Sequence, residues 1–453
     1  MPPFKGGHNT RFCEYMGGVE RVDTEPYTLR GEENCDRSLK WSTGAHLCTQ
    51  PRDETELLRD FFHNEFQDSG LDFGSVDVDT SMFPSDTCPG LPWTKWGFKT
   101  KQAVIDAYGM EKLIQAGELQ IDSECVPVYE FCKTEAQKVG KEVRTITCYP
   151  IHVHLAHIKW LSMFSTATKK IKEVKIGWNK WQGGIQNFCS SHTKPHKDMG
   201  DGRKFDSRLP NIHVEIPLEE YFMMFPEYEQ LESFFDKLIN GITCCLVISS
   251  NGQVYIKLSG NPSGCIITGE INSCCNDEAY LTAFMRKCKN RGIRVTDLRS
   301  FREHNDLDVY GDDQFGSHDD QGVCCRELNS LLTDLTYDFP EDEAICQDSV
   351  EGLTFLGNTF YKQGHLWLWR PAKPKKILSK LKFTEKRDSE LDINLELSIV
   401  RGLLVECAWD ADLWNTIYPY QQYLERLGAS CTDPVLGIHV NRARVEKLTF
   451  GEL

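Results

Sequence analysis

Three short segments of the chain carry side chains that could bind divalent cations and a phosphorylated sugar. The first is Tyr310-Gly311-Asp312-Asp313, which lies between two apolar runs with the composition of strands. Glycine and aspartate suit a two-residue hairpin turn, and such a turn presents both carboxylates at its tip. Carboxylate oxygens are among the ligands that Mg²⁺ prefers. An ordinary hairpin explains the same residues equally well, so this segment alone does not decide between structure and function.

The second segment holds two more carboxylates, Asp201 and Asp206, in the run Asp-Gly-Arg-Lys-Phe-Asp. We interpret residues 202–210 as a short strand that ends at Pro210. Side chains alternate along a strand, so positions five apart face opposite sides. One acid could therefore bind a metal ion while the other points away and does different work. The pattern is also common by chance.

The third segment is a glycine-rich loop, Ser259 to Gly264, followed by a predicted helix over residues 265–289. Its glycines permit a ligand to approach the backbone closely. Thr268 and Asn272 are four residues apart and share one face of the helix, where a hydroxyl and an amide could bind a sugar hydroxyl. Ser263 could equally be the N-cap of that helix, and both roles are compatible.

In their order along the chain, these segments resemble motifs A, B and C of the RNA-dependent RNA polymerases of positive-strand RNA viruses, in the picornavirus- and astrovirus-like supergroup. The resemblance implies that Asp201, Asp312 and Asp313 are catalytic and bind two Mg²⁺ ions, with Mn²⁺ as an alternative ion. It also implies that five residues bind the incoming nucleotide: Asp206, Ser263, Gly264, Thr268 and Asn272.

The resemblance extends to a basic segment upstream. Lys133, Lys141 and Arg144 resemble motif F, whose basic side chains neutralise the triphosphate of the incoming nucleotide. The resemblance therefore assigns these three residues to nucleotide binding. Compared with the usual family pattern, one extra residue separates Lys141 from Arg144, which affects the alignment of Lys141 but not that of Arg144.

Two further loops resemble motifs of the same family. Pro89 and Gly90 belong to a Pro/Gly-rich loop that resembles motif G at the template entry, which implies a place on the RNA path. Residues 355–357, Phe-Leu-Gly, resemble motif E, the primer grip. One family feature is missing, because motif D usually supplies a lysine as proton donor and none lies between Asp313 and Lys362. The alternative donors include Arg326, His318 and water.

Charge is unevenly distributed along the second half of the chain. Residues 303–351 contain 15 acids and one base, whereas residues 362–387 contain nine bases and one acid. An acidic block beside a basic block fits cations at one place and phosphates at another, and it also fits solvated helix faces. Given the resemblance, we expect phosphate contacts to the RNA backbone from Arg370, Lys373, Lys375, Lys376 and Lys380.

Length and composition agree with a large enzyme. The 453 residues are 40% hydrophobic and 11% aromatic, which supports a sizeable core and excludes a wholly disordered chain. Helical patterns and hairpins without regular βαβ spacing predict an α+β fold. The resemblance implies a right-hand polymerase whose palm is an antiparallel sheet flanked by helices. The expected divisions are fingers at 1–175, palm at 176–217, a fingers insertion at 218–250, palm at 251–365 and a helical thumb at 366–453.

Several protein classes are disfavoured. A net charge of −16 argues against a simple nucleic-acid coat protein. No apolar run approaches the roughly 20 residues of a membrane helix, and the N-terminus lacks the apolar stretch of a secretory signal. The 19 cysteines include no C-x-x-C pair, which argues against a zinc site and favours reduced, buried thiols.

Through the resemblance, the sequence predicts an RNA-directed RNA polymerase that transfers nucleotides from NTPs to a 3′-hydroxyl and releases pyrophosphate. The expected partners are template and product RNA, NTPs and other viral replication proteins. The expected location is the host cytoplasm, at membrane-associated replication complexes reached through partners. A reverse transcriptase-like polymerase is one alternative, against which the pair Asp206 and Asn272 argues. A non-catalytic RNA-binding protein is the other, but it would not need three ordered acidic and polar segments.

Overall fold

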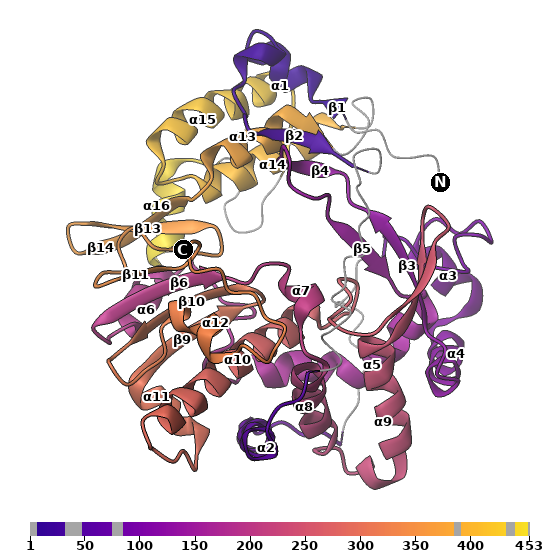
Figure 1. Cartoon of the computed structure of the whole chain (residues 1–453). Coiled ribbons are helices and arrows are strands. Elements are labelled where there is room, and N and C mark those ends of the chain that lie inside the picture. The colour runs from indigo at the N-terminus through magenta and orange to yellow at the C-terminus, as the bar shows by residue number, and fades with distance from the viewer. Residues whose placement is uncertain (1–6, 32–47, 75–84, 385–390, 432–439, 452–453) are drawn as a thin grey trace.

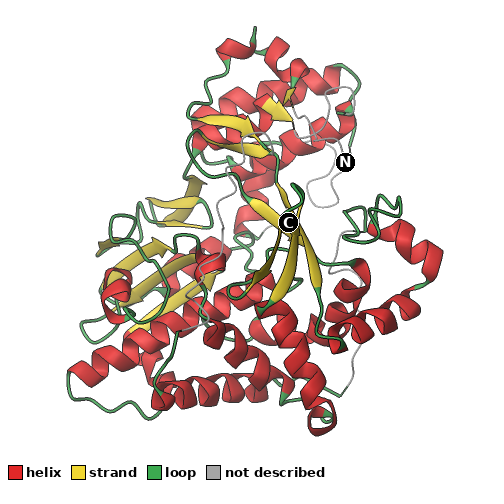
Figure 2. Ribbon diagram, turned by 45° about the vertical axis from the view of Figure 1, so that its right-hand side comes forward, coloured by secondary structure: helices red, strands yellow, loops and turns green. Residues whose placement is uncertain are grey.

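The computed structural model describes residues 7–31, 48–74, 85–384, 391–431 and 440–451 (Figure 1). Helices and mostly antiparallel sheets are interspersed along the chain, which confirms the predicted α+β class (Figure 2). Within these ranges, no helix combines the length and the apolar character needed to cross a membrane.

A four-stranded antiparallel sheet carries two of the three segments singled out above. Its strands in spatial order are β11 (Ile345–Gln347), β6 (His196–Asp201), β10 (Asp313–His318) and β9 (Asn305–Tyr310). With the helices that separate them in sequence, these strands form a β-α-β-β-α-β arrangement in which β6 and β10 lie side by side at the centre.

The two faces of this central sheet are covered differently. On one face, Phe315 of β10 packs against α6 (Gly184–Ser191) and a three-stranded sheet. The strands of that smaller sheet are β12 (Thr354–Phe355), β13 (Asn358–Gln363) and β14 (Leu366–Pro371). On the other face lie the long helix α10 (Thr268–Asn290) and the 3₁₀ helix η6 (Cys325–Glu327), which leads into α12 (Leu328–Leu331).

A second four-stranded sheet stands apart from the first. Its spatial order is β5 (Thr145–Cys148), β3 (Pro127–Cys132), β7 (Cys245–Ser249) and β8 (Val254–Lys257), with β3 and β7 parallel. The helices around it and around the main core are α2 (Arg52–Asp68), α3 (Lys101–Tyr108), α4 (Met110–Asp122), α5 (Ile151–Thr168), α8 (Asn211–Phe222) and α9 (Tyr228–Thr243).

The C-terminal part is helical, as predicted, and the first described elements of the chain pack against it. Its elements are α13 (Pro374–Lys382), β15 (Phe383–Thr384), α14 (Ile393–Glu406), α15 (Ala411–Arg426) and α16 (Arg442–Phe450). The N-terminal elements β1 (Gly7–His8), α1 (Thr10–Tyr15) and η1 (Val19–Arg21) lie beside these helices (Figure 1). Strand β1 pairs with β15, and β2 (Tyr27–Arg30) pairs with β4 (Glu135–Lys138) near α13.

One local prediction is wrong. Residues 202–210 do not form a strand, because the strand is β6 just before them and residues 205–208 form the short helix α7 (Phe205–Arg208). Strand β6 was not predicted because its sequence is polar, although Lys197 and Asp198 are both buried in it. The stretch from Lys101 to Asp122 forms two helices, α3 and α4, because the chain turns at Gly109, whose φ is 81°. The division into fingers, palm and thumb stays a prediction.

Candidate active site

The three acids predicted to bind metal come together at one end of the central sheet. Asp201 ends β6, Asp313 begins β10, and the two residues are direct partners across these strands. Asp312 precedes Asp313 in the two-residue turn between β9 and β10. Gly311 opens that turn with a φ of 63°, a value that glycine adopts without strain. The hairpin and its register therefore bring three carboxylates to one edge of the sheet.

Burial and the repulsion between neighbouring carboxylates raise the pKa values of these carboxyl groups. Desolvation and the charges of Asp312 and Asp313 raise the pKa of Asp201 to about 7. Desolvation and Asp312 likewise raise the pKa of Asp313 to about 6. Asp201 and Asp312 nevertheless keep exposed surface, so solutes can reach them. Concentrated negative charge of this kind destabilises the ionised state until a cation binds.

Replacing Asp201 by asparagine should stabilise the folded chain at alkaline pH. The folded-state pKa of Asp201 lies above its ordinary value of 3.8, so wild-type stability declines as the pH rises toward about 7 and the group ionises beside its neighbours. In a buffer with chelator, we expect Asp201→Asn to melt about 2 °C above wild type near pH 8 and level with it near pH 3.5. A variant that melts below wild type at both pH values would contradict this repulsion.

Asn261 joins Asp206 and Asn272, two of the residues predicted to bind the incoming nucleotide. It is fully buried, and its backbone N–H donates to the carbonyl oxygen of Asp206 at 2.8 Å. Its side-chain amide donates to Oδ1 of Asn272 at 2.9 Å and to the carbonyl of Thr268 at 3.2 Å. Asp206 on α7 and Asn272 on α10 are therefore held to one common residue. The sequence pointed to the loop but not to Asn261 itself.

Helix α10 also holds the acidic hairpin turn. The hydroxyl of Ser273 accepts a hydrogen bond from the backbone N–H of Gly311 at 2.8 Å. The side-chain amide of Asn276 donates to the carbonyl of Gly311 at 3.0 Å. Neither residue was predicted, although both follow Asn272 within one helical turn and so approach the same region. The helix thus fixes the turn that carries Asp312.

The remaining residues of the third segment shape the loop. The Ser263 hydroxyl accepts from the backbone N–H of Thr147 in β5 at 3.1 Å. A Cβ atom on Gly264 would lie 1.8 Å from the carbonyl oxygen of Thr147, so only glycine allows this approach. The Thr268 hydroxyl donates to the carbonyls of Pro262 and Cys265 at 2.9 and 2.7 Å. These contacts dock the loop on the second sheet, and nucleotide binding by the three residues stays a prediction.

A buried lysine that the sequence did not suggest supports the same loop. Lys257, at the end of β8, is 1% exposed. Its Nζ donates to the carbonyls of Thr243, Ser259 and Gly260 at 3.0, 3.0 and 2.5 Å. Desolvation lowers its pKa to about 8. The ammonium group therefore ties the beginning of the loop to the end of α9.

The predicted triphosphate-binding residues surround Glu135. Lys133 Nζ lies 3.4 Å from Glu135 Oε2, and Arg144 Nε lies 3.7 Å from Glu135 Oε1. Lys141 and Arg144 are exposed, and their charges oppose the rise that desolvation causes in the pKa of Asp312. Lys141 acts in the same way on Asp201. The structure thus places basic side chains within electrostatic reach of the acids.

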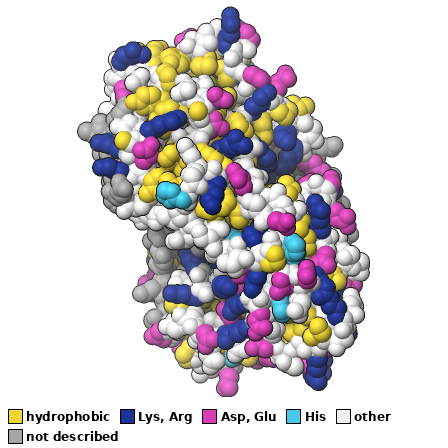
Figure 3. Space-filling model, turned by 90° about the vertical axis from the view of Figure 1, so that its left-hand side faces the viewer, with side chains coloured by type: hydrophobic (Ala, Val, Ile, Leu, Met, Phe, Trp, Pro, Cys, Tyr) yellow, Lys and Arg dark blue, Asp and Glu magenta, His cyan; other side chains and the backbone are white. Residues whose placement is uncertain are grey.

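The predicted RNA-binding lysines lie on and just before α13. Lys373 opposes the rise in the pKa of Asp313, so this region also adjoins the acids. Lys376 and Lys380 line a cavity of about 530 Å³ together with Lys133. Lys375 pairs with Asp23 at 2.8 Å, and Arg370 is exposed beside the Tyr361 ring. The face in Figure 3 shows Lys and Arg interspersed with Asp and Glu.

The loop of Pro89 and Gly90 is anchored beneath the start of α5. Both residues are buried, and the carbonyl of Pro89 accepts from the backbone N–H of Ile151 at 2.9 Å. Gly90 has a φ of 74°, and a Cβ atom there would lie 2.6 Å from the carbonyl oxygen of Tyr149. The structure therefore gives these two residues a positioning role within the loop.

His318, one of the alternative proton donors, lies far from the three acids. His318 ends β10 whereas Asp313 begins it, and five residue steps along a strand span about 17 Å. His318 is also buried. Arg326 is exposed, and its Nε donates to the carbonyl of Ala344 at 3.3 Å. His318 is thus too far from the acids to donate a proton there.

The acidic edge suits Mg²⁺. Its donors are carboxylate oxygens, which match a hard divalent cation, and no sulfur or imidazole ligand is part of the trio. Asp201, Asp312 and Asp313 are the residues that would hold such ions. Their raised pKa values are the expected mark of a site that needs positive charge.

Comparisons with known proteins agree with this geometry. The family model for viral RNA-dependent RNA polymerase matches residues 64–425. Non-structural polyprotein 1AB of Ovine astrovirus 1 is 24% identical over 348 residues, or 73% of this chain and 25% of that polyprotein. The same polyprotein of Human astrovirus-1 is 24% identical, over 66% of this chain and 21% of the polyprotein.

A plant virus polyprotein is also similar. Genome polyprotein 1 of Barley yellow mosaic virus (isolate Germany) is 26% identical over 242 residues, or 50% of this chain and 9% of that polyprotein. The chain thus spans a quarter or less of the length of these relatives. Because the family match covers most of the chain and includes every element of the acidic site, the chain belongs to the family of viral RNA-dependent RNA polymerases.

Proposed function

We propose that this chain is an RNA-directed RNA polymerase that joins NTPs to the 3′-hydroxyl of a growing RNA strand and releases pyrophosphate. The observation that carries the proposal is the pairing of Asp201 with Asp313 beside Asp312, within electrostatic reach of Lys141 and Arg144. Phosphoryl transfer depends on positioning and on neutralising the charge of the phosphates. Acids that bind cations and bases that bind a triphosphate meet both needs.

The basic residues would bind the triphosphate. Lys133 and Arg144 now share Glu135 as their partner, and the phosphates of an NTP offer a denser negative charge. When an NTP is bound, the side chains of Arg144 and Lys141 would contact its phosphates. Divalent cations bound by the three aspartates would activate the 3′-hydroxyl and stabilise the charge on the leaving pyrophosphate.

The sugar would be recognised by Asp206 and Asn272. Both are held by Asn261, so their relative position is set before the nucleotide arrives. The 2′-hydroxyl distinguishes RNA from DNA precursors, and a carboxylate together with an amide can bind it. This arrangement supports RNA synthesis over the alternative of a reverse transcriptase-like polymerase.

RNA would be held through its phosphates. Lys373, Lys376 and Lys380 are exposed along α13, and phosphate contacts from lysines do not depend on sequence. Pro89 and Gly90 would act by shaping the template-entry loop. The relatives are polyproteins, which supports the further proposal that other viral replication proteins are partners of this chain.

The direct test is primed synthesis on a defined RNA template. Purified wild-type chain is supplied with Mg²⁺ and either NTPs or dNTPs, and Asp201→Asn serves as the inactive control. We expect template-dependent extension with NTPs and little with dNTPs. Preferential extension with dNTPs would favour a reverse transcriptase, and RNA binding without extension would favour a non-catalytic role.

Asn272→Ala should weaken sugar selection. A site built to bind a hydroxyl loses about 1–3 kcal/mol when one hydrogen-bond partner is removed. We therefore expect the catalytic efficiency with an NTP to fall by roughly 10- to 100-fold, and that with the matching dNTP to fall less. The measurement is the ratio of the two efficiencies, with a melting curve on the same sample.

A matched control separates this role from helix stability. Asn290→Ala changes an exposed asparagine at the other end of α10 and should leave the ratio unchanged. If Asn272→Ala lowers both efficiencies equally and also lowers the melting temperature, Asn272 only supports the helix.

A further inference from the structure

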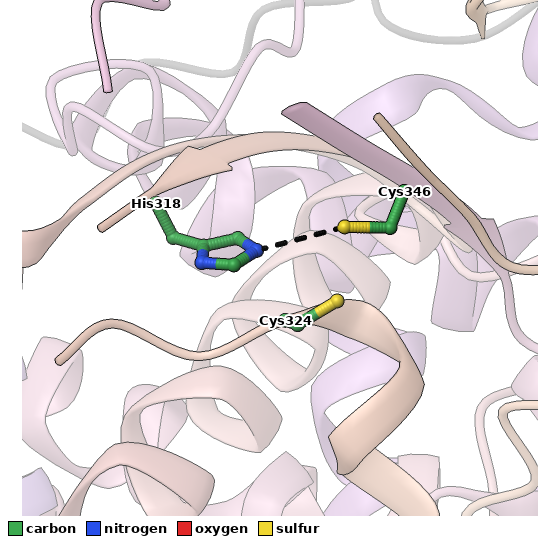
Figure 4. A group of neighbouring side chains, drawn as sticks. All are labelled: His318, Cys324 and Cys346. Atoms are coloured by element: carbon green, nitrogen blue, oxygen red, sulfur yellow. Dashed lines mark hydrogen bonds between the residues drawn. The ribbon is translucent and has the colours of Figure 1, made fainter. Parts of the chain in front are cut away.

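A second group of metal-binding side chains lies on the opposite face of the central sheet from Phe315. Cys346 of β11 is the direct partner of Asp198 in β6, which in turn is the partner of Gly316 in β10. His318 follows Gly316 by two positions and so faces the same side. Cys324 is the N-cap residue just before η6, which covers this face. Nε2 of His318 and the Sγ atoms of Cys324 and Cys346 lie within 4.8 Å of one another (Figure 4).

The imidazole of His318 is oriented as a metal ligand. Its Nδ1 is 3.0 Å from the carbonyl oxygen of Asp319, so Nδ1 carries the proton and donates it there. Its Nε2 points at the sulfurs and lies 3.9 Å from Cys346 Sγ. Metal-binding histidines usually have their second nitrogen fixed in this way. In a tetrahedral zinc site, bond lengths of about 2.0 and 2.3 Å place N and S about 3.6 Å apart, close to the distance here.

A buried carboxylate lies beside Cys324, one of the three side chains. Asp198 is 1% exposed, and its carboxylate lies within 4.8 Å of the sulfurs of Cys324 and Cys325. A Cβ atom on Gly316 would lie 2.7 Å from Asp198 Oδ1, so the glycine makes room for this carboxylate. One oxygen accepts from the backbone N–H of Cys325 at 2.5 Å. An acid buried among thiols is costly unless positive charge is present.

We propose that His318, Cys324 and Cys346 bind a zinc ion, with Asp198 as the fourth ligand. Mixed sulfur, nitrogen and carboxylate donors in a compact group suit Zn²⁺ rather than Mg²⁺. The ligands come from β10, the start of η6, β11 and β6, so no short cysteine spacing marks the site in the sequence. The sequence argument against zinc considered only closely spaced cysteines, and this site has none.

The electrostatics of the group agree with metal binding. Hydrogen bonds from Cys325 and His318 lower the pKa of the Cys324 thiol. Although desolvation opposes it, the interaction with Cys324 raises the pKa of His318 to about 9. Desolvation raises the pKa of Asp198 to about 7. A cation would take the place of the proton on His318 and stabilise the anionic forms of Cys324 and Asp198.

The site would anchor a segment that reaches the nucleotide side. Cys324 and Cys346 bracket residues 325–345, and the zinc would fix both ends to β10. Within this segment, the carbonyl of Asp338 accepts from the backbone N–H of Arg203 at 2.8 Å. The Phe339 ring also lies against Phe205 of α7, at 6.0 Å between centroids. Because α7 also carries Asp206, the ion would stabilise the surroundings of that residue.

The test is metal content of the full chain, purified in a reducing buffer without chelator. We expect about one zinc ion per chain, lost in Cys324→Ser and Cys346→Ser. Asp198→Asn should weaken zinc affinity at least about 10-fold. Cys288→Ser, at a buried cysteine of α10 outside the group, is the matched control and should keep the ion. Asp201→Asn should also keep it, which separates this site from the predicted Mg²⁺ site.

A second measurement does not depend on whether variants fold. Wild-type chain stripped of metal is titrated with Co²⁺, whose absorption spectrum reports tetrahedral thiolate coordination, and Zn²⁺ should displace it. The proposal is overturned if reduced wild-type chain retains no zinc and shows no such spectrum, or if Cys346→Ser binds zinc as wild type does. A disulfide between Cys324 and Cys346 in chain purified from a reducing cytosol would also overturn it.

Discussion

Asp312→Asn should abolish nucleotide incorporation and leave the fold unchanged. Asp312 is exposed in the turn between β9 and β10, so its carboxylate is not needed for packing. Asparagine keeps the shape but removes the charge that a divalent cation needs. Losing a group that supports a metal ligand already costs about 10–100-fold, so losing a ligand should cost more than about 100-fold. The measurement is the initial rate of primed RNA synthesis with saturating Mg²⁺ and NTPs.

Asp53→Asn provides the matched control. It removes the same charge from an exposed position of α2, outside the site, and should incorporate nucleotides at the wild-type rate. The melting temperature of Asp312→Asn should equal or exceed that of wild type in chelator. Near-wild-type synthesis by Asp312→Asn would show that the cations bind elsewhere.

Lys257→Met should have the largest effect on stability. Methionine fills a similar volume, but it leaves the carbonyls of Thr243, Ser259 and Gly260 without the ammonium donor they now have. Buried groups that lose a charged partner cost about 2–5 kcal/mol of unfolding free energy. Because the loop places Asn261 against Asp206, we also expect synthesis to slow more than about 10-fold. Urea unfolding and initial rates measure the two effects.

Lys289→Met tests the same chemical change at the surface. Lys289 is exposed near the end of α10, with 67% of its side chain accessible, so its loss should change the unfolding free energy by less than about 0.5 kcal/mol. If Lys257→Met is no more destabilising than this control, then solvent or neighbouring groups replace the ammonium.

Features determined by neighbouring residues were predictable from the sequence. The acidic hairpin depends on Gly311 and on apolar runs on both sides of it, and these lie within a dozen positions. A helix was predicted over residues 265–289, and the structure has it as α10 over Thr268–Asn290. The segments with direct chemical meaning, Asp312 to Asp313 and Ser259 to Gly264, were therefore located before the fold was known.

Features determined by distant contacts were not predictable in this way. Alternation along β8 favours burial of Val254 and Ile256, yet these are 60% and 61% exposed and Lys257 is buried. The ammonium group of Lys257 is satisfied by the carbonyl of Thr243 in α9 and by those of Ser259 and Gly260 in the loop that follows. Strand β6 was not predicted because Lys197 and Asp198, which are buried, are residue types typical of a surface loop. The partners that satisfy such polar groups appear only after the chain is folded.

The packing of residues 7–21 against the C-terminal helices has a consequence for synthesis on the ribosome. Phe12 is fully buried against Tyr420, at 4.8 Å between ring centroids, and β1 pairs with β15. At about 5–20 residues per second, roughly 20–80 s separate the emergence of Phe12 from that of its partner. During that interval Phe12 has no burial site. A chain interrupted before α15 would therefore expose Phe12, and chaperones or proteases could distinguish it from a finished chain.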